Sequence, residues 1–219
     1  HYFMLASRDS KKKLETFCGK CHTPLGVRAK ELPFKHVLRK AGDTKVSPVF
    51  AEGLNCDFCH TISGRTGIGN SSYKLRPSNT KLGPLADARP TTHKAELATF
   101  YRSSEYCGTC HQVSHPGNGI VLEDTYQEWK ASAYASAGIT CQHCHMAPGL
   151  TPPTATDAGS IGKPRKLPGR AATTGPKRPH VSEHTFLGPN VVFLQGKKWA
   201  RRRALSLALL RQAGRVRPF

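Results

Sequence analysis

The sequence predicts a chain that is mainly coil, with a few short α-helices and little or no β-sheet. Apolar residues make up 37% of its 219 residues, and it contains 16 prolines and 20 glycines. This composition is poor in the residues that build an ordinary globular core. All 8 cysteines fall into four copies of one pentapeptide, Cys-x-x-Cys-His. We therefore expect the polypeptide to wrap bound groups instead of packing a large core of its own.

The four pentapeptides carry the chemistry of the chain. Their cysteine pairs are Cys18 and Cys21, Cys56 and Cys59, Cys107 and Cys110, and Cys141 and Cys144, and the histidines that follow are His22, His60, His111 and His145. Cys-x-x-Cys-His is the attachment signature of a c-type haem, in which the thiols bind the porphyrin covalently and the histidine ligates the iron. Zinc sites and disulfides are the alternatives, but neither needs a histidine after every second cysteine. The sequence therefore predicts four covalently bound haem c groups.

The N-terminal half is expected to contain little regular structure. A short helix is predicted over residues 10–18, leading into the first motif. Residues 23–55 contain three prolines and are expected to be loop with one helical turn. Glycine and proline punctuate residues 63–89, which favours an extended loop. An Asn-x-Ser sequon at Asn70 would make this loop a glycan acceptor in an exported chain.

Two helices are predicted before the fourth motif. Residues 93–107 are expected to be helical and to deliver Cys107. A longer helix is predicted at residues 124–137, because Asp124 can cap it and Gly138 can end it. Its apolar stripe is expected to pack on the face of a haem.

The composition changes after residue 149. Pro, Gly, Thr, Lys and Arg dominate residues 150–178, which are expected to form a basic extended linker. Residues 197–214 are predicted to be a helix docked on this protein or a neighbour, with a membrane-surface helix as the alternative. The predicted organisation is a tetrahaem-binding domain at 1–149, the linker, and a C-terminal segment at 179–219 with a distal histidine and the helix.

The number of histidines predicts the coordination of the irons. The chain has 11 histidines, and 7 remain after the four motifs are filled. Met4 and Met146 are the only methionines, and Met146 follows its own proximal histidine too closely to reach the opposite face of that haem. All four irons can therefore be bis-histidine, which leaves no open position for a substrate and favours electron transfer. The distal candidates are His93, His115 and His184, with His1, His36, His143 and His180 competing for the fourth place.

Net charge and the absence of apolar runs predict location and partners. The formal charge is +19, of which haem propionates would offset a part, so acidic partners are favoured. Nucleic acid is not favoured, because no reading motif accompanies the charge. Covalent haem attachment indicates an exported protein, and no signal peptide precedes His1, as expected of a mature product. No apolar run reaches the roughly 20 residues that span a bilayer.

Residues outside the haem motifs support a resemblance. The segments Asn55–Gly64, Tyr106–Pro116, Leu122–Lys130 and Gly138–Met146 resemble multihaem cytochromes related to the tetrahaem carrier of ammonia oxidisers. They are most similar to tetrahaem subunits that polymerise into extracellular cytochrome nanowires. The resemblance implies bis-histidine ligation by His93, His115 and His184, haems stacked in parallel and T-shaped pairs, and a histidine donated across the subunit boundary. His143 and Pro189 depart from the expected pattern.

Three functions follow, in order of preference. The first is a polymerising subunit of an extracellular electron-transfer filament, with haem stacking between subunits and His1 at the end of an apolar start that could reach a neighbour's haem. The second is a soluble periplasmic tetrahaem shuttle that docks acidic redox partners. The third is a haem enzyme acting on nitrogen compounds, which needs a five-coordinate iron and is disfavoured by the surplus of histidines.

Overall fold

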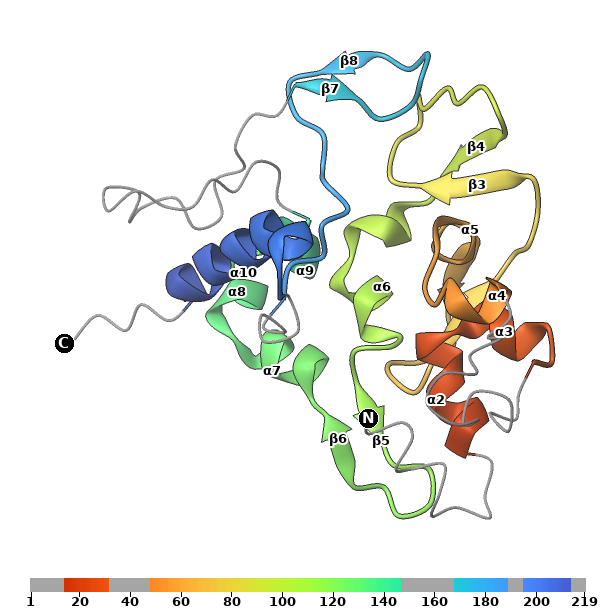
Figure 1. Cartoon of the computed structure of the whole chain (residues 1–219), viewed down its shortest axis with the longest axis vertical. Helices are drawn as coiled ribbons and strands as arrows, with labels where there is room; N and C mark the ends of the chain where they lie inside the picture. The colour runs from red at the N-terminus through yellow and green to blue at the C-terminus, as the bar shows by residue number, and fades with distance from the viewer. Residues whose placement is uncertain (1–13, 32–47, 147–167, 189–194, 214–219) are drawn as a thin grey trace.

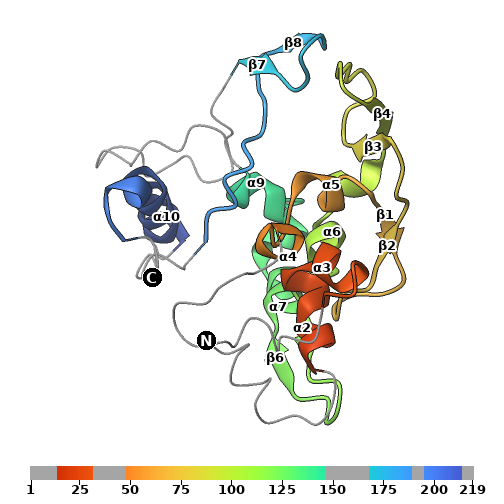
Figure 2. The same cartoon turned by 45° about the vertical axis from the view of Figure 1, so that its right-hand side comes forward.

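The computed structural model describes residues 14–31, 48–146, 168–188 and 195–213. Short helices account for most of the regular structure. They are α2 (Leu14–His22), α3 (Pro24–Arg28), α4 (Pro48–Ala51), α5 (Cys56–Cys59), α6 (Ser104–Gly108), α7 (Thr125–Ala131), α8 (Ala133–Ser136), α9 (Cys141–His145) and α10 (Ala200–Ala213), with 3-10 turns η2 (Thr99–Arg102) and η4 (Lys197–Trp199). Figure 1 and Figure 2 both show α6 in the middle of the molecule, among α5, α7 and α9.

The strands pair only in twos within the described residues. They are β1 (Ile62–Arg65), β2 (Tyr73–Leu75), β3 (Thr80–Gly83), β4 (Lys94–Leu97), β5 (Val113–Ser114), β6 (Val121–Glu123), β7 (Gly169–Arg170) and β8 (Lys177–Arg178). β3 and β4 are parallel, and β1–β2, β5–β6 and β7–β8 are antiparallel. The structure therefore confirms the predicted fold class, mainly coil with short helices and little sheet.

Several of the best-buried apolar side chains lie in or around the second motif. Phe58, inside that motif, is 1% exposed and meets the ring of Tyr73 edge-on at 5.0 Å between centroids. Ile62 follows on β1 and Leu82 lies on β3, and both are buried. Each such side chain contributes about 1.5–3 kcal/mol by leaving water. This small cluster fixes the second motif against the β1–β2 and β3–β4 ladders.

The third motif is packed against α7. Gly108, inside the motif, lies so close to the Tyr126 ring that a Cβ added there would sit 2.5 Å from Tyr126 Cδ2. Arg65 on β1 also reaches α6 and donates two hydrogen bonds to the Glu105 carboxylate, at 2.9 and 2.8 Å. The third motif is thereby tied to elements that precede and follow it in the chain.

Three predicted segments differ from the structure. Residues 93–107 are not one helix but β4, η2 and α6, because β4 pairs in parallel with β3, with Thr80 opposite Lys94. Strand pairing beside a buried Leu82 outweighs the helical propensity of Lys-Ala-Glu-Leu. Residues 63–89, expected to be an extended loop, contain most of β1 and all of β2 and β3. Two helical turns, α3 and α4, lie in 23–55 where one was expected.

The predicted helix at 124–137 is interrupted at Ser132. The Ser132 backbone is extended (φ −84°, ψ 161°), which separates α7 from α8. The Asp124 side chain makes no cap bond and accepts a hydrogen bond from Gln112 Nε2 at 2.7 Å instead. Gly138 ends α8 as predicted, with φ +71°.

The C-terminal residues form a hairpin and a docked helix. The β7–β8 hairpin lies inside the predicted linker and is held to the 87–89 segment by an ion pair from Arg178 to Asp87. α10 agrees with the predicted helix, and buries Leu205 and Ala208. In the described part of the chain, no helix has the length and apolar character needed to cross a membrane.

Candidate haem-attachment sites

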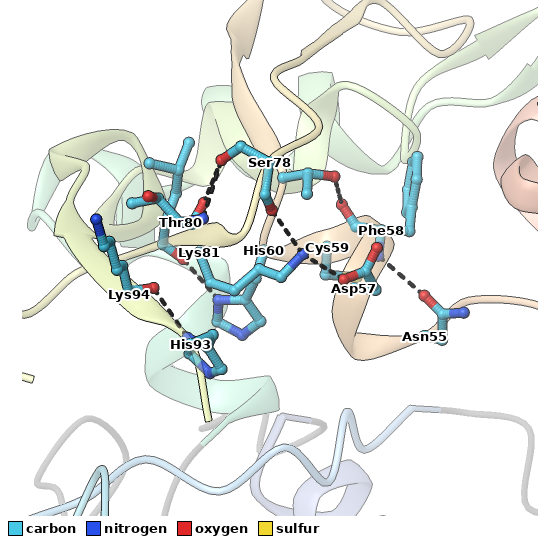
Figure 3. Close-up of polar contacts among 12 residues, drawn as sticks. Asn55, Asp57, Phe58, Cys59, His60, Ser78, Thr80, Lys81, His93 and Lys94 are labelled. Carbon is cyan, nitrogen blue, oxygen red and sulfur yellow. Dashed lines mark hydrogen bonds and ion pairs between the residues drawn. The ribbon is translucent and has the colours of Figure 1, made fainter. Parts of the chain in front are cut away.

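Each pentapeptide lies on a helical turn. The first motif occupies the end of α2, the second forms α5 with His60 as its C-cap, the third begins on α6, and the fourth forms α9. On a helical turn, residues i and i+3 lie on the same face, so the two cysteines of a motif can address one partner. Asn55 starts the second motif by accepting a hydrogen bond from Phe58 N at 2.9 Å, which is an N-cap (Figure 3).

Three motif histidines have their Nδ1 atoms bound to oxygen acceptors. His60 Nδ1 donates to the Leu82 carbonyl at 2.6 Å, His145 Nδ1 donates to the Leu187 carbonyl, and His111 Nδ1 lies 2.9 Å from Glu123 Oε1. Carbonyl and carboxylate oxygens only accept, so the proton of each neutral ring is on Nδ1. This tautomer leaves Nε2 with a lone pair, which is the arrangement of a histidine that ligates a metal.

His60 and His184 are spaced like two ligands of one iron. Their ring centroids are 6.1 Å apart. Metal–nitrogen bonds of about 2 Å and ring radii of about 1.2 Å separate the centroids of two trans imidazoles by roughly 6.3 Å. Burial, followed by the nearby His60, lowers the pKa of His184, which favours the neutral ring that a metal needs. The residues therefore fit a bis-histidine haem at the second motif.

The segment that carries His184 connects the second and fourth motifs. Phe186 meets the His184 ring edge-on at 5.9 Å and is 54% exposed, so it offers an apolar surface beside the His60–His184 pair. Leu187 is buried, and its carbonyl accepts the Nδ1 proton of His145. One short segment therefore positions a histidine at the second motif and orients the histidine of the fourth.

The other predicted distal histidines are placed differently. His93 lies directly before β4, and its Nδ1 bonds the Lys94 carbonyl at 2.9 Å, which again leaves Nε2 with a lone pair (Figure 3). His115 Nδ1 accepts a hydrogen bond from Gly117 N at 3.1 Å, so the proton of its neutral ring is on Nε2. His115 would have to give up this bond to ligate through Nε2, and its role stays a prediction.

His143 has a structural use. Its Nδ1 accepts from the Thr140 backbone N–H at 2.9 Å and lies 2.9 Å from Thr140 Oγ1, closing a capping box at the start of α9. Glutamate or glutamine usually fills this position, which gives a physical reason for the departure from the expected acidic residue. His180 is half-buried in the segment before His184. His1 and His36 lie outside the described residues.

The third motif lies next to the other three. The thiol of Cys21 lies close to that of Cys110, and the thiol of Cys107 lies close to that of Cys141. The second motif is joined by Tyr106, whose hydroxyl donates to the Cys59 carbonyl at 3.0 Å. Motif order along the chain is therefore not the order of neighbours in space.

The arrangement of the cysteines can be compared with the two alternatives, a zinc site and a set of disulfides. All 8 cysteines are free thiols in the structure. Across the described ranges, no three or more His, Cys, Asp or Glu side chains gather as a metal-ligand cluster. Each Cys-x-x-Cys pair is followed directly by its own histidine, while thiols of different motifs approach each other at Cys21–Cys110 and Cys107–Cys141.

Sequence reasoning did not find the partners of the motif histidines. Leu82 and Leu187 act through main-chain carbonyls, for which no side-chain signal exists. Glu123 has a sequence signal, because it is an acidic residue 12 positions after His111 in a segment with turn residues between. A predicted hairpin over this stretch would have placed the two together.

Comparison with known proteins finds a similarity to a solved structure. No family model matches the chain, and no curated protein matches it. Among solved structures, the chain is similar to a penta-heme cytochrome c552 from Thermochromatium tepidum, with a TM-score of 0.47 and 22% sequence identity. The match covers 84% of this chain and 46% of that protein, so the chain spans about half the length of this relative.

Proposed function

We propose that the chain is a multihaem c-type cytochrome that transfers electrons through four covalently bound haems. The observation that carries the proposal is the His60–His184 pair, spaced at 6.1 Å with the Nδ1 proton of His60 held by Leu82. The haem iron supplies the one-electron redox chemistry. His60 and His184 would hold the iron of the second motif from both sides, and would thereby leave no position for a reactant.

The positions of the motifs support an electron relay in which the haem of the third motif lies between the other three. The third motif lies next to the first and fourth through thiol contacts, and next to the second through Tyr106. Ser104 accepts from the Cys141 N–H at 3.0 Å, and Gln142 Nε2 donates to the Ser103 carbonyl at 2.9 Å. These bonds lock α6 to α9, so the spacing between two haem attachments is set by protein.

We further propose that the protein works as a subunit of an extracellular filament. The surplus of histidines supports this proposal, since His1 can serve a neighbour's haem while histidines of this chain serve its own. A head-to-tail contact repeated between identical subunits would generate the filament. Its remaining positive charge would favour acidic redox partners or acceptors.

The experiment has three readouts on the natively exported holoprotein. Haem and iron content should give four haems per chain and no zinc. Ferric spectra should be low-spin and unchanged by added cyanide, and electron microscopy should show filaments. Zinc in place of iron would contradict the cytochrome assignment, and a high-spin, cyanide-sensitive iron would favour a haem enzyme.

The soluble periplasmic shuttle is the second candidate, and the charge of +19 favours it. A shuttle would share the haems and ligands but would remain monomeric at every concentration. Its rate of electron transfer to an acidic partner would fall steeply with salt. Monomers in sedimentation and an absence of filaments by microscopy would establish the shuttle over the filament.

A further inference from the structure

The three observed acceptors of motif-histidine protons are not equivalent. His60 and His145 donate to neutral main-chain carbonyls, whereas His111 faces the Glu123 carboxylate at 2.9 Å. A hydrogen bond to an ionised acceptor is roughly twice as strong as one between neutral groups. The imidazole of His111 is therefore distinguished from the other two by the charge of its partner.

The surrounding structure holds Glu123 in place. Glu123 is paired with Val113 in the β5–β6 ladder. Thr125 Oγ1 donates to Glu123 Oε1 at 3.1 Å, and the Tyr126 N–H donates to the His111 carbonyl at 2.9 Å. The strand pairing, the hydroxyl and the main-chain bond together fix the carboxylate against the ring. Glu123 is a positioning residue, since it acts on the metal only through His111.

A carboxylate in this position makes the imidazole a more basic ligand. It draws the Nδ1 proton toward itself and gives the ring partial imidazolate character. A more basic ligand stabilises ferric iron, which carries the extra positive charge, more than ferrous iron. The reduction potential of that iron consequently falls. The His111 and Glu123 side chains are 63% and 39% exposed, so water and salt weaken the electrostatic effect of this contact.

We propose that Glu123 sets the potential of the iron held by His111 below the potentials of the irons held by His60 and His145. This inference rests on the proposed function, because it presupposes a haem at the third motif. Since that motif lies next to the other three, the low-potential iron is at the centre of the relay. An electron that crosses the subunit would then have to reduce this low-potential iron, which is an energetically unfavourable step in the middle of the relay.

The test is a spectroelectrochemical titration of the holoprotein with Glu123→Gln, which keeps an oxygen acceptor but removes the charge. We expect one of the four potentials to rise by about 59 mV or more, which is a tenfold change in the oxidised-to-reduced equilibrium of a one-electron couple. The matched control is Glu128→Gln, which removes an exposed charge on α7. Four unchanged potentials in Glu123→Gln, or an equal shift in both variants, would overturn the proposal.

A second variant tests whether the position of the Glu123 carboxylate matters, independently of an effect on folding. Thr125→Val removes the hydroxyl that holds Glu123 and should raise the same potential by less than Glu123→Gln does. The electron paramagnetic resonance signal of one low-spin haem should change in both variants, because it reports imidazolate character. If the protein contains no haem, the proposed function fails; if four haems are bound but the signal and potentials do not move, only the role of Glu123 fails.

Discussion

At the scale of single residues, the proposed closure of an iron at His60 depends on His184. Its ring centroid lies 6.1 Å from that of His60. Because Ala cannot ligate iron, we expect His184→Ala to leave this haem five-coordinate and to convert one of four low-spin signals to high-spin. Electron paramagnetic resonance of the ferric holoprotein measures the change. Four unaltered low-spin signals in His184→Ala would mean that another histidine, such as His93, serves this iron.

His143 provides the opposite prediction to His184, because we expect it to cap a helix and not to ligate an iron. Because Nδ1 of His143 caps α9, His143→Ala should lower the free energy of unfolding by about 1 kcal/mol. His143→Gln should recover most of this loss, since Gln at this position also closes a capping box. Chemical unfolding of the holoprotein measures both. A high-spin signal in either variant would assign His143 to an iron instead.

At the scale of elements, the loop between β1 and β2 fastens onto the third motif. Gly69 N donates to the Gly108 carbonyl at 2.8 Å, and Asn70 N donates to the Gln112 carbonyl at 2.9 Å. Asn70 Oδ1 also accepts from the Ser114 N–H at 2.9 Å. The side chain of the predicted sequon is therefore used to join the two segments.

Gly69 is the position where this clasp can be tested. Its φ is +83°, and a Cβ there would sit 2.4 Å from the Gln112 carbonyl oxygen. We expect Gly69→Ala to destabilise the protein by about 1–3 kcal/mol, because strained backbone and a main-chain clash combine. Thermal unfolding of the holoprotein measures the loss.

The control for Gly69 is Gly119, which also has positive φ (+73°) but nothing within 4 Å of an added Cβ. Gly119→Ala should show the backbone strain alone and destabilise by less. If the two variants unfold at the same temperature, the close approach of Gly69 to Gln112 contributes nothing, and the clasp is not what holds the third motif.

The same elements explain how much could be predicted from sequence. The motif helices were predicted only in part: the sequence predicted helical residues leading up to Cys18 and Cys107, but no helix over the second and fourth motifs, which form α5 and α9. The β3–β4 ladder was not, because it depends on a parallel partner and on burial of Leu82, and neither leaves a periodic pattern in residues 80–97. The break at Ser132 likewise has no sequence pattern, and the tertiary bond beside it, from Trp129 Nε1 to the Ile139 carbonyl at 2.8 Å, joins segments that no periodicity relates.

The candidate site, like the fold, was predictable from the sequence only in part. The surplus of histidines and the resemblance made His184 a ligand candidate, but its proximity to His60 needed the segment 184–187 to be placed in space. Acceptors such as the Leu82 carbonyl are main-chain atoms, which every residue has. Sequence therefore predicts which atoms can ligate, and the tertiary structure determines which tautomer each ring adopts.

At the scale of the whole molecule, the charge is unevenly distributed. Residues 150–219 contain 14 Lys and Arg but only Asp157 and Glu183 as acidic residues. All four haem motifs lie before residue 150, so haem propionates would offset charge there and leave the C-terminal part strongly basic. The exposed Arg201, Arg202 and Arg203 on α10 are consequently the expected contact for an anionic electron acceptor.

Replacing these three arginines by Gln should slow reduction of a soluble anionic acceptor by roughly tenfold at low ionic strength. Stopped-flow rates of the reduced holoprotein measure this. The difference from wild type should vanish near 1 M salt, where the screening length is only about 3 Å. The control replaces Lys74, Lys94 and Lys130 by Gln, which removes the same charge from exposed positions in the haem-binding part. Equal slowing by both triple variants would mean that net charge alone attracts the acceptor, because only a local contact distinguishes one cluster of cations from another of the same size.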